Sequence, residues 1–202
     1  FRIQKWAPSA STGVTVAGGN GYGFSANQFT TAWDVFVDTA GNVYVCDGVS
    51  SRIQKWAPGA SFGITVAGGN GSGSAANQLN NPTGIYIDGS GNMYIADNGN
   101  NRVQKWAPGA IAGITVAGGN GAGSASNQLL NPWDVFLDAN ESMYISEVGN
   151  HRVQKWVPGA TSGITVAGGN GQGDNANQLN TPYNVFVDSR ESIFVADFYN
   201  NR

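Results

Sequence analysis

Hydrophobic and polar residues alternate in short runs along the chain, and clusters of Gly, Ser and Asn separate the runs. In the segment from Pro82 to Trp106, two alternating runs cover Gly84–Asp88 and Asn92–Asp97, and a third covers Arg102–Trp106. A fourth run follows at Gly113–Ala117. Period-two alternation of β-branched and aromatic residues between turn clusters is typical of consecutive antiparallel strands. The pattern therefore predicts four short strands in this unit.

The four-strand unit recurs with a period of 50 residues. One arginine marks the same position in each copy: Arg2, Arg52, Arg102, Arg152 and Arg202. Periods of 20–50 residues indicate propellers, solenoids or arrays, and four short strands per period favour a propeller blade. We therefore expect an all-β fold, a β-propeller with four blades of 50 residues in a single domain over residues 1–202. The repeats are 1–50, 51–100, 101–150 and 151–200.

The strands are named a to d from the inside of a propeller outward. Strand a is expected at Trp33–Asp38, Thr83–Asp88, Trp133–Asp138 and Tyr183–Asp188, and strand b at Asn42–Asp47, Asn92–Asp97, Ser142–Glu147 and Ser192–Asp197. Strand c covers Arg2–Trp6 and its copies, and strand d covers Gly13–Ala17 and its copies.

The chain opens on strand c and stops just after strand b. We therefore expect strands c and d of residues 1–17 to pair with strands a and b of residues 183–197, so that both termini close the end blade and remove two exposed sheet edges. Two alternatives stay open. The 202 residues belong to a longer array, or the end strands pair with another molecule.

Two motifs, D-x-x-x-N-R and P-x-x-V/I-x-x-D, recur in register over the whole chain. The first is seen at Asp97–Arg102, with Glu147–Arg152 and Asp197–Arg202 as further copies. In these motifs the chain resembles the NHL repeat family. The resemblance implies a β-propeller of four-stranded antiparallel blades, most often six of them. This chain differs in having four repeats of 50 residues, whereas propeller repeats commonly have about 40–45.

Charge and composition exclude two classes of partner. Charged residues make up 11% of the chain, and nine of its ten basic residues stand at repeat positions, Arg190 being the exception. No free basic patch is left for phosphates, so we expect no nucleic-acid binding. No apolar run approaches the roughly 18–20 residues that cross a bilayer, so we expect no membrane insertion. The opening residues FRIQKW belong to a strand motif, so we expect any targeting segment to lie outside this sequence.

Residues that are identical in every repeat have structural explanations. The tryptophans that end strand c are expected to pack between blades, and the arginine of strand c to meet the acid that ends strand b. The AGGNGxG segment is followed by no helical pattern, so its glycines are expected to allow positive φ rather than to bind a dinucleotide. The Asn-Gln pair that follows is expected to tie this connection down by side-chain–backbone bonds. Cys46 is alone and is expected to be a buried thiol.

The residues needed for catalysis or metal binding are scarce. His151 is the single histidine, which excludes a His-rich zinc site and leaves a solvated loop position as its expected role. Asp34 and Asp134 alone make a weak calcium site. We therefore expect no enzyme activity, no metal and no cofactor.

Differences between the repeats gather at the start of strand a and in the b–c loop, which in a propeller lie on one face around the mouth of the central channel. Trp-Asp pairs occur in repeats one and three, which would face each other across a four-bladed ring. An aromatic ring covers the C–H face of a sugar or peptide, and a carboxylate or amide takes its hydrogen bonds. The candidate ligand-binding residues are Trp33, Asp34, Trp133, Asp134, Tyr183, Asn184, Phe198 and Tyr199. The alternative is that Trp33 and Trp133 only fill gaps between inner strands.

The sequence thus favours a non-enzymatic recognition scaffold that binds a glycan or a protein partner at the channel mouth. The competing interpretation is a structural repeat protein that assembles into a fibre or an extracellular matrix by end-to-end strand pairing. Two N-x-S sequons, at Asn70 and Asn140, are candidate glycosylation sites and point to an extracellular location.

Overall fold

The computed structural model describes residues 1–202 and is all β. Its only helices are two single 3-10 turns, η1 (Asn98–Asn100) and η2 (Phe198–Asn200). No helix is long and apolar enough to cross a membrane. The predicted strands a to d are all present, with boundaries that agree with those expected from the alternation to within one residue.

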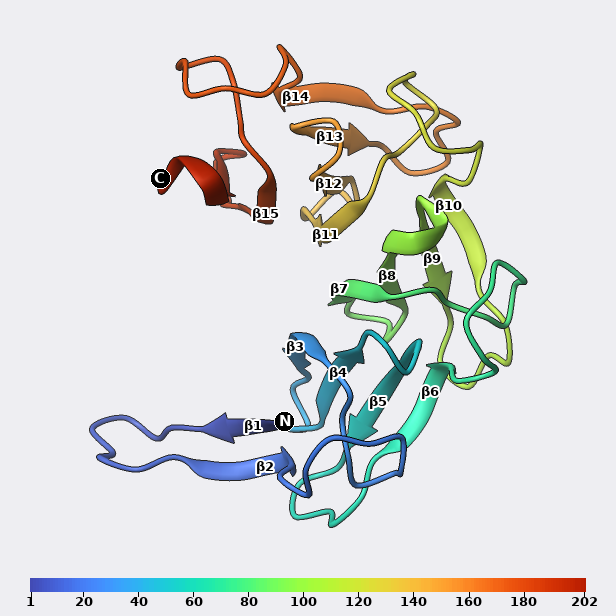
Figure 1. The fold of residues 1–202 in the computed structure, drawn as a ribbon, viewed down its shortest axis with the longest axis vertical. Helices are drawn as coiled ribbons and strands as arrows, with labels where there is room; N and C mark the ends of the chain where they lie inside the picture. The colour runs from blue at the N-terminus through green and yellow to red at the C-terminus, as the bar shows by residue number, and fades with distance from the viewer.

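Three sheets of four antiparallel strands follow one another along the chain, and each is termed a blade. The first blade contains β3 (Ala32–Val37), β4 (Val43–Asp47), β5 (Arg52–Trp56) and β6 (Ile64–Gly68). The second contains β7 (Pro82–Ile87), β8 (Met93–Asp97), β9 (Arg102–Trp106) and β10 (Ile114–Gly118). The third contains β11 (Pro132–Leu137), β12 (Met143–Glu147), β13 (Arg152–Trp156) and β14 (Ile164–Gly168). Figure 1 shows the blades fanning out in an arc, with β3, β7 and β11 on its inner side.

The two ends of the chain form separate sheets of two strands. β1 (Arg2–Lys5) pairs with β2 (Val14–Gly18), and β15 (Pro182–Val187) pairs with β16 (Ile193–Asp197), but the two pairs do not join each other. The expectation that both termini close one end blade is therefore wrong for this structure. The arc stays open between these two end sheets (Figure 1).

In the C-terminal sheet, Arg202 binds Asp197, with 2.7 Å between Nε and Oδ2. The structure thus contains three complete blades and two half-blades, and four closed blades are not confirmed.

Apolar side chains fill the spaces between neighbouring blades. In one cluster, Ile53 and Leu79 lie with Ile85, Ile95 and Trp106 from the next blade. Trp56, Trp106 and Trp156 are buried in this way, which confirms packing between blades for these three tryptophans. The expectation is wrong for Trp6, which is exposed because no blade packs against it in this structure. Each indole N–H donates to the glutamine two residues before it, as Trp106 does to Gln104 at 3.0 Å.

The residues of the D-x-x-x-N-R motif form a buried network of an ion pair and hydrogen bonds. This network connects each b–c loop to the segment that precedes its blade. Arg102 Nε lies 2.7 Å from Asp97 Oδ2, and the remaining guanidinium N–H groups donate to backbone carbonyls at Ser74, Ala75 and Gln78. The other Asp97 oxygen accepts the Asn80 N–H at 2.7 Å. The Asn100 amide donates to Asp97 and to the Gly73 carbonyl, both at 2.8 Å. The expected ion pair is confirmed here and at Arg52, Arg152 and Arg202.

The glycine-rich connection has the positive φ angles that its sequence predicts. Gly118 has φ +68°, and a Cβ there would lie 2.5 Å from the Asn101 carbonyl oxygen, so only glycine fits. The Gln128 amide donates to the Asn120 carbonyl at 3.0 Å, as expected. Asn127 differs from the expectation, because it contributes its carbonyl oxygen to the Asn120 side chain and not its own amide.

Candidate functional site

Five of the predicted site residues form one continuous line of aromatic rings, termed the aromatic row. Its members are Trp33, Trp133, Tyr183, Phe198 and Tyr199. The ring centroids of Trp33 and Trp133 are 5.2 Å apart with an edge-to-face geometry. Trp133 stacks on Tyr183, and Tyr183 stacks on Phe198, both at 4.4 Å. Trp33, Phe198 and Tyr199 are exposed.

Trp33 and Trp133 meet because the equivalent residue between them is small. Trp33 and Trp133 stand two repeats apart, and the equivalent residue of the repeat between them is Thr83. Thr83 is buried, and its hydroxyl donates to the Trp133 carbonyl at 2.7 Å. The Trp33 indole N–H donates to Asn81 Oδ1 at 3.1 Å. The two tryptophans therefore touch each other, where a closed four-bladed ring would place them on opposite sides of a channel.

The predicted Asp34 and Asp134 join inner strands of neighbouring blades. The two Asp34 oxygens accept the N–H groups of Val35 at 2.7 Å and Ile85 at 2.9 Å, so that β3 is bonded to β7. Asp134 likewise accepts from Val135 at 2.8 Å and Val185 at 3.0 Å, bonding β11 to β15. Both carboxylates therefore have a structural role that was not predicted from the sequence.

The second repeat has Gly84 where the first and third repeats have Asp34 and Asp134, and the packing of the inner strands explains this difference. A Cβ at Gly84 would lie 2.7 Å from the Cα of Asp134 and from the Trp133 carbonyl oxygen. The inner strands β7 and β11 therefore approach too closely for any side chain there. Asn184, the equivalent residue of the last repeat, is exposed, and its amide lies 3.4 Å from Asp134 Oδ2.

Burial raises the pKa of Asp134 to about 6, and the nearby Asp34 carboxylate adds to this rise. Burial also raises the pKa of Asp34, against the lowering effect of its two backbone hydrogen bonds. The Cys46 thiol is buried as expected, and its pKa is raised by burial and by the neighbouring carboxylates. The centre of the arc therefore disfavours negative charge.

The raised pKa of Asp134 predicts a pH-dependent stability. A carboxyl whose pKa is higher in the folded state contributes stability that is full below its unfolded pKa near 3.8 and is lost as pH rises through about 6. A shift of about two units corresponds to at most ~3 kcal/mol. Urea unfolding at pH 5 and pH 8 tests this, with Asp134→Asn as the variant and the exposed Asp174→Asn as the control. We expect the difference between wild type and Asp134→Asn to change by ~1–3 kcal/mol between these pH values. A constant difference would refute the assignment.

The single histidine has a structural partner. His151 Nδ1 accepts the Thr181 N–H at 3.0 Å, which is the bond that Asn101 Oδ1 makes to Asn131 in the preceding repeat. The side chain is half-buried, so the solvated position expected from the sequence is only partly correct. No group of three or more His, Cys, Asp or Glu residues has an arrangement that could hold a metal ion.

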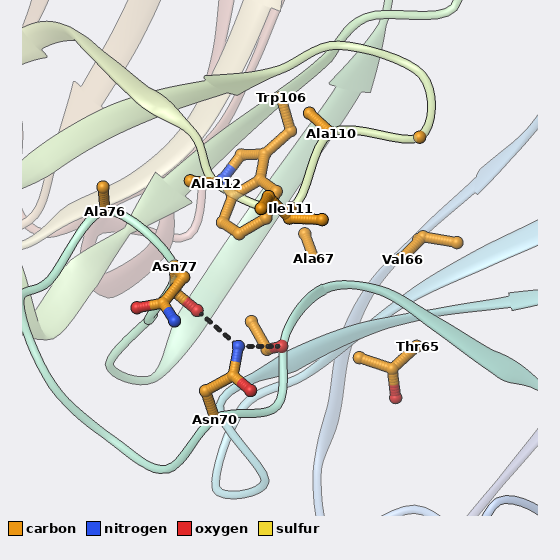
Figure 2. A pocket seen from close by; sticks show the side chains of 12 residues that line it. Thr65, Val66, Ala67, Asn70, Ala76, Asn77, Trp106, Ala110, Ile111 and Ala112 are labelled. Atoms are coloured by element: carbon orange, nitrogen blue, oxygen red, sulfur yellow. Dashed lines mark hydrogen bonds between the residues drawn. The ribbon is translucent and has the colours of Figure 1, made fainter.

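The two sequons differ in their surroundings. The Asn70 amide donates to the carbonyl groups of Asn77 at 2.9 Å and Gly68 at 3.4 Å (Figure 2), and the other repeats make the same bonds without a sequon. Asn140 is exposed in a turn, and its side-chain amide makes no hydrogen bond. Glycosylation at either site stays a prediction, and Asn140 has the freer amide.

A pocket between blades was not predicted from the sequence. It has a volume of about 720 Å³ and lies between the edge strand β6 and the next blade, where Trp106 and the loop at Ala110–Ala112 form its far wall (Figure 2). A similar pocket of about 680 Å³ recurs one blade later, beside β10 and Trp156. Most of the residues that line these pockets are the same in every repeat. A search for differences between the repeats therefore could not find the pockets.

The comparisons with known proteins agree with this architecture. Residues 79–106 match the NHL repeat family, and no curated protein sequence matches the chain. In a structure of a nidogen/laminin complex, one chain superposes with a TM-score of 0.71 at 16% identity, covering 98% of this chain and 64% of that one.

Two further solved structures show the same fold. An auxiliary nutrient binding protein from Bacteroides thetaiotaomicron gives a TM-score of 0.63 at 15% identity, covering 81% of this chain and 44% of that one. A streptogramin B lyase gives 0.56 at 12% identity, covering 84% and 49%. The chain thus spans between 44% and 64% of the length of these three solved chains. The resemblance to the NHL-repeat β-propeller family is therefore confirmed by the match at residues 79–106 and by the similar fold.

Proposed function

We propose that residues 1–202 act as one NHL-like propeller domain with a recognition function and no catalytic activity. The domain binds a glycan or a protein partner at the face that carries the aromatic row. The observation that supports this most is the row itself, because five aromatic rings in contact lie where the repeats differ and three of them are exposed. By contrast, the arginine and tryptophan that hold the blades together, such as Arg102 and Trp106, are the same in every repeat.

The chemistry of the row favours an uncharged ligand surface. The Tyr183 ring is stacked between Trp133, at an interplanar angle of 9°, and Phe198. The exposed rings of the row, which are Trp33, Phe198 and Tyr199, cover the C–H face of a sugar or the side chains of a peptide. The exposed Asn184 amide supplies hydrogen bonds beside them. Asp34 and Asp134 are bonded to backbone N–H groups, so they contribute by holding the row in place.

The similar structures support binding as the general role. One belongs to a nidogen/laminin complex and one is a nutrient binding protein. An extracellular location for this chain is part of the same proposal. A lyase shares the fold, but here the carboxylates nearest the aromatic row are occupied by backbone donors.

Glycan and peptide arrays probed with the wild-type chain test this proposal. For any ligand found, Trp33→Ala and Trp133→Ala are each expected to weaken binding about tenfold or more, as for buried aromatic anchors of other interfaces. Trp6→Ala is the matched control, because Trp6 is an exposed tryptophan outside the row. Binding that is unchanged in both row variants, or lost equally in the control, would contradict the proposed site.

A further inference from the structure

The pocket of about 720 Å³ between the first two blades is lined by the outer edge of a sheet. β6 is the last strand of the first blade and pairs on one side only, with β5. Four consecutive residues of β6, residues 65–68, line the pocket. Successive side chains of a strand point to opposite faces, so four lining residues in a row place the backbone edge along the pocket. The backbone N–H and C=O groups of such an edge are a template for another extended chain.

A polar side chain in the wall of this pocket has no partner. The Asn77 carbonyl accepts the Asn70 amide at 2.9 Å (Figure 2), but the Asn77 side-chain amide is exposed and makes no hydrogen bond within the chain. The other repeats have the same asparagine, and its side chain makes no hydrogen bond there either: Asn27, Asn127 and Asn177. An amide offers a donor and an acceptor, which match the C=O and N–H groups of a peptide backbone.

Ile111 gives the pocket a side chain that the other repeats lack. It lies on the loop between β9 and β10, beside Trp106 in the same wall (Figure 2). The equivalent residues are Ser11, Ser61 and Thr161. Because Ile111 is 90% exposed, it contributes little to packing within the chain. Its apolar side chain is therefore free to contact a ligand in the pocket.

The lining of the pocket indicates the chemistry of its ligand. No charged residue lines it, so a ligand with a phosphate group or a metal ion would find no counter-charge there. An uncharged peptide in extended conformation fits, because its backbone pairs with a strand edge and its apolar side chains cover an exposed isoleucine.

We propose that this pocket binds an extended, uncharged peptide segment of a partner protein. The backbone of the peptide pairs with the free edge of β6 and adds a fifth strand to the first blade. The Asn77 amide bonds to the same backbone, and one apolar side chain of the peptide packs on Ile111. Trp33 of the aromatic row lies on β3, at the opposite edge of this sheet. The peptide site is therefore separate from the recognition face and goes beyond the function proposed above.

The pocket of about 680 Å³ one blade later has the same frame with a different side chain. Residues 115–118 of β10 line it, and Asn127 stands in the place of Asn77. Thr161 stands in the place of Ile111. We therefore expect this second pocket to bind the same peptide more weakly, because it lacks the apolar contact.

A phage-displayed library of short random linear peptides, selected on the wild-type chain, tests the proposal. The selected peptides are expected to share an apolar residue with uncharged neighbours. For a synthetic copy of one such peptide, Ile111→Thr is expected to weaken binding about tenfold. Thr161→Ile is expected to create a second site of similar affinity. Ile164→Thr is the control, because Ile164 is an exposed isoleucine that lines neither pocket.

Methyl groups on the backbone nitrogens of the peptide test the strand pairing itself. Alternate N–H groups of a strand point to opposite sides. Methylation of the alternate residues that face β6 is expected to weaken binding about tenfold or more, whereas methylation of the intervening residues is expected to have little effect. In NMR spectra of the labelled chain, the backbone amide signals of residues 65–68 are expected to move when the peptide is added.

The outcomes separate this inference from its alternatives. A library that yields no binding peptide, binding that is unchanged in Ile111→Thr, or equal effects of the two methylation patterns would overturn it. Binding that is lost in Trp33→Ala and kept in Ile111→Thr would place the peptide on the aromatic row, which contradicts the peptide site and supports the recognition function. Self-association of the chain that Ile111→Thr abolishes would assign the pocket to a second copy and contradict a peptide partner.

Discussion

Replacing Arg102 by alanine is expected to lower the free energy of unfolding by about 3–5 kcal/mol, because it leaves a buried carboxylate without its cation. Asp97 is fully buried, and Arg102 is its ion-pair partner at 2.7 Å. The substitution also removes the donors that hold the carbonyl groups of Ser74, Ala75 and Gln78. The connection that leads into the blade would therefore lose its main anchor.

Urea unfolding measures this effect, and the repeat supplies a matched control. Arg2 stands at the same position of its repeat but is exposed and has no acidic partner. At a concentration where the chain is monomeric, Arg2→Ala is expected to change stability by less than about 0.5 kcal/mol, as surface substitutions usually do. Equal losses in Arg2→Ala and Arg102→Ala would show that the buried ion pair has no special role.

Replacing Trp106 by alanine is expected to lower the free energy of unfolding by about 3–5 kcal/mol. Trp106 is buried between two blades, where Ile53 and Leu79 of one blade meet Ile95 of the next. Its removal leaves a cavity at the contact that sets the position of one blade relative to the other. The indole bond to Gln104 is lost as well.

Trp6→Ala is the matched control for this second variant, because Trp6 has the same place in its repeat and is exposed. We expect thermal unfolding of the monomeric chain to change little in Trp6→Ala and by several degrees in Trp106→Ala. A similar unfolding temperature for both variants would contradict packing between blades as the role of the repeated tryptophan.

The blades could be predicted from the sequence because their causes are local. Period-two alternation fixes which residues face the neighbouring sheet, and turn residues fix where each strand ends. The Asp97–Arg102 pair was predictable because both residues flank one short loop. The repeats also showed where structure alone explains a residue, since four equivalent positions carry the same side chain.

Closure of the arc could not be predicted in the same way. The angle between blades depends on how side chains pack between them, as Trp106 does with Ile53, and no single repeat contains both sides of that contact. The bonds from Asp34 to Ile85 and from Asp134 to Val185 also join different repeats. From the sequence, these carboxylates were therefore predicted to bind a ligand, whereas in the structure they connect inner strands.

The candidate site was predictable as a set of residues but not as a shape. Differences between repeats pointed to the start of strand a, and the structure places five of the eight residues in one aromatic row. The contact between Trp33 and Trp133 depends on Thr83, a small residue of the repeat between them. Only the packed inner strands show that rings from different repeats meet.

The most direct test of the account is to record the indole N–H signals of the six tryptophans by NMR while a ligand found on the arrays is added. The account predicts that the signals of Trp33 and Trp133 move, while those of the buried Trp56, Trp106 and Trp156 stay in place. Movement confined to Trp6 or to the buried tryptophans, with Trp33 and Trp133 unchanged, would contradict recognition through the aromatic row.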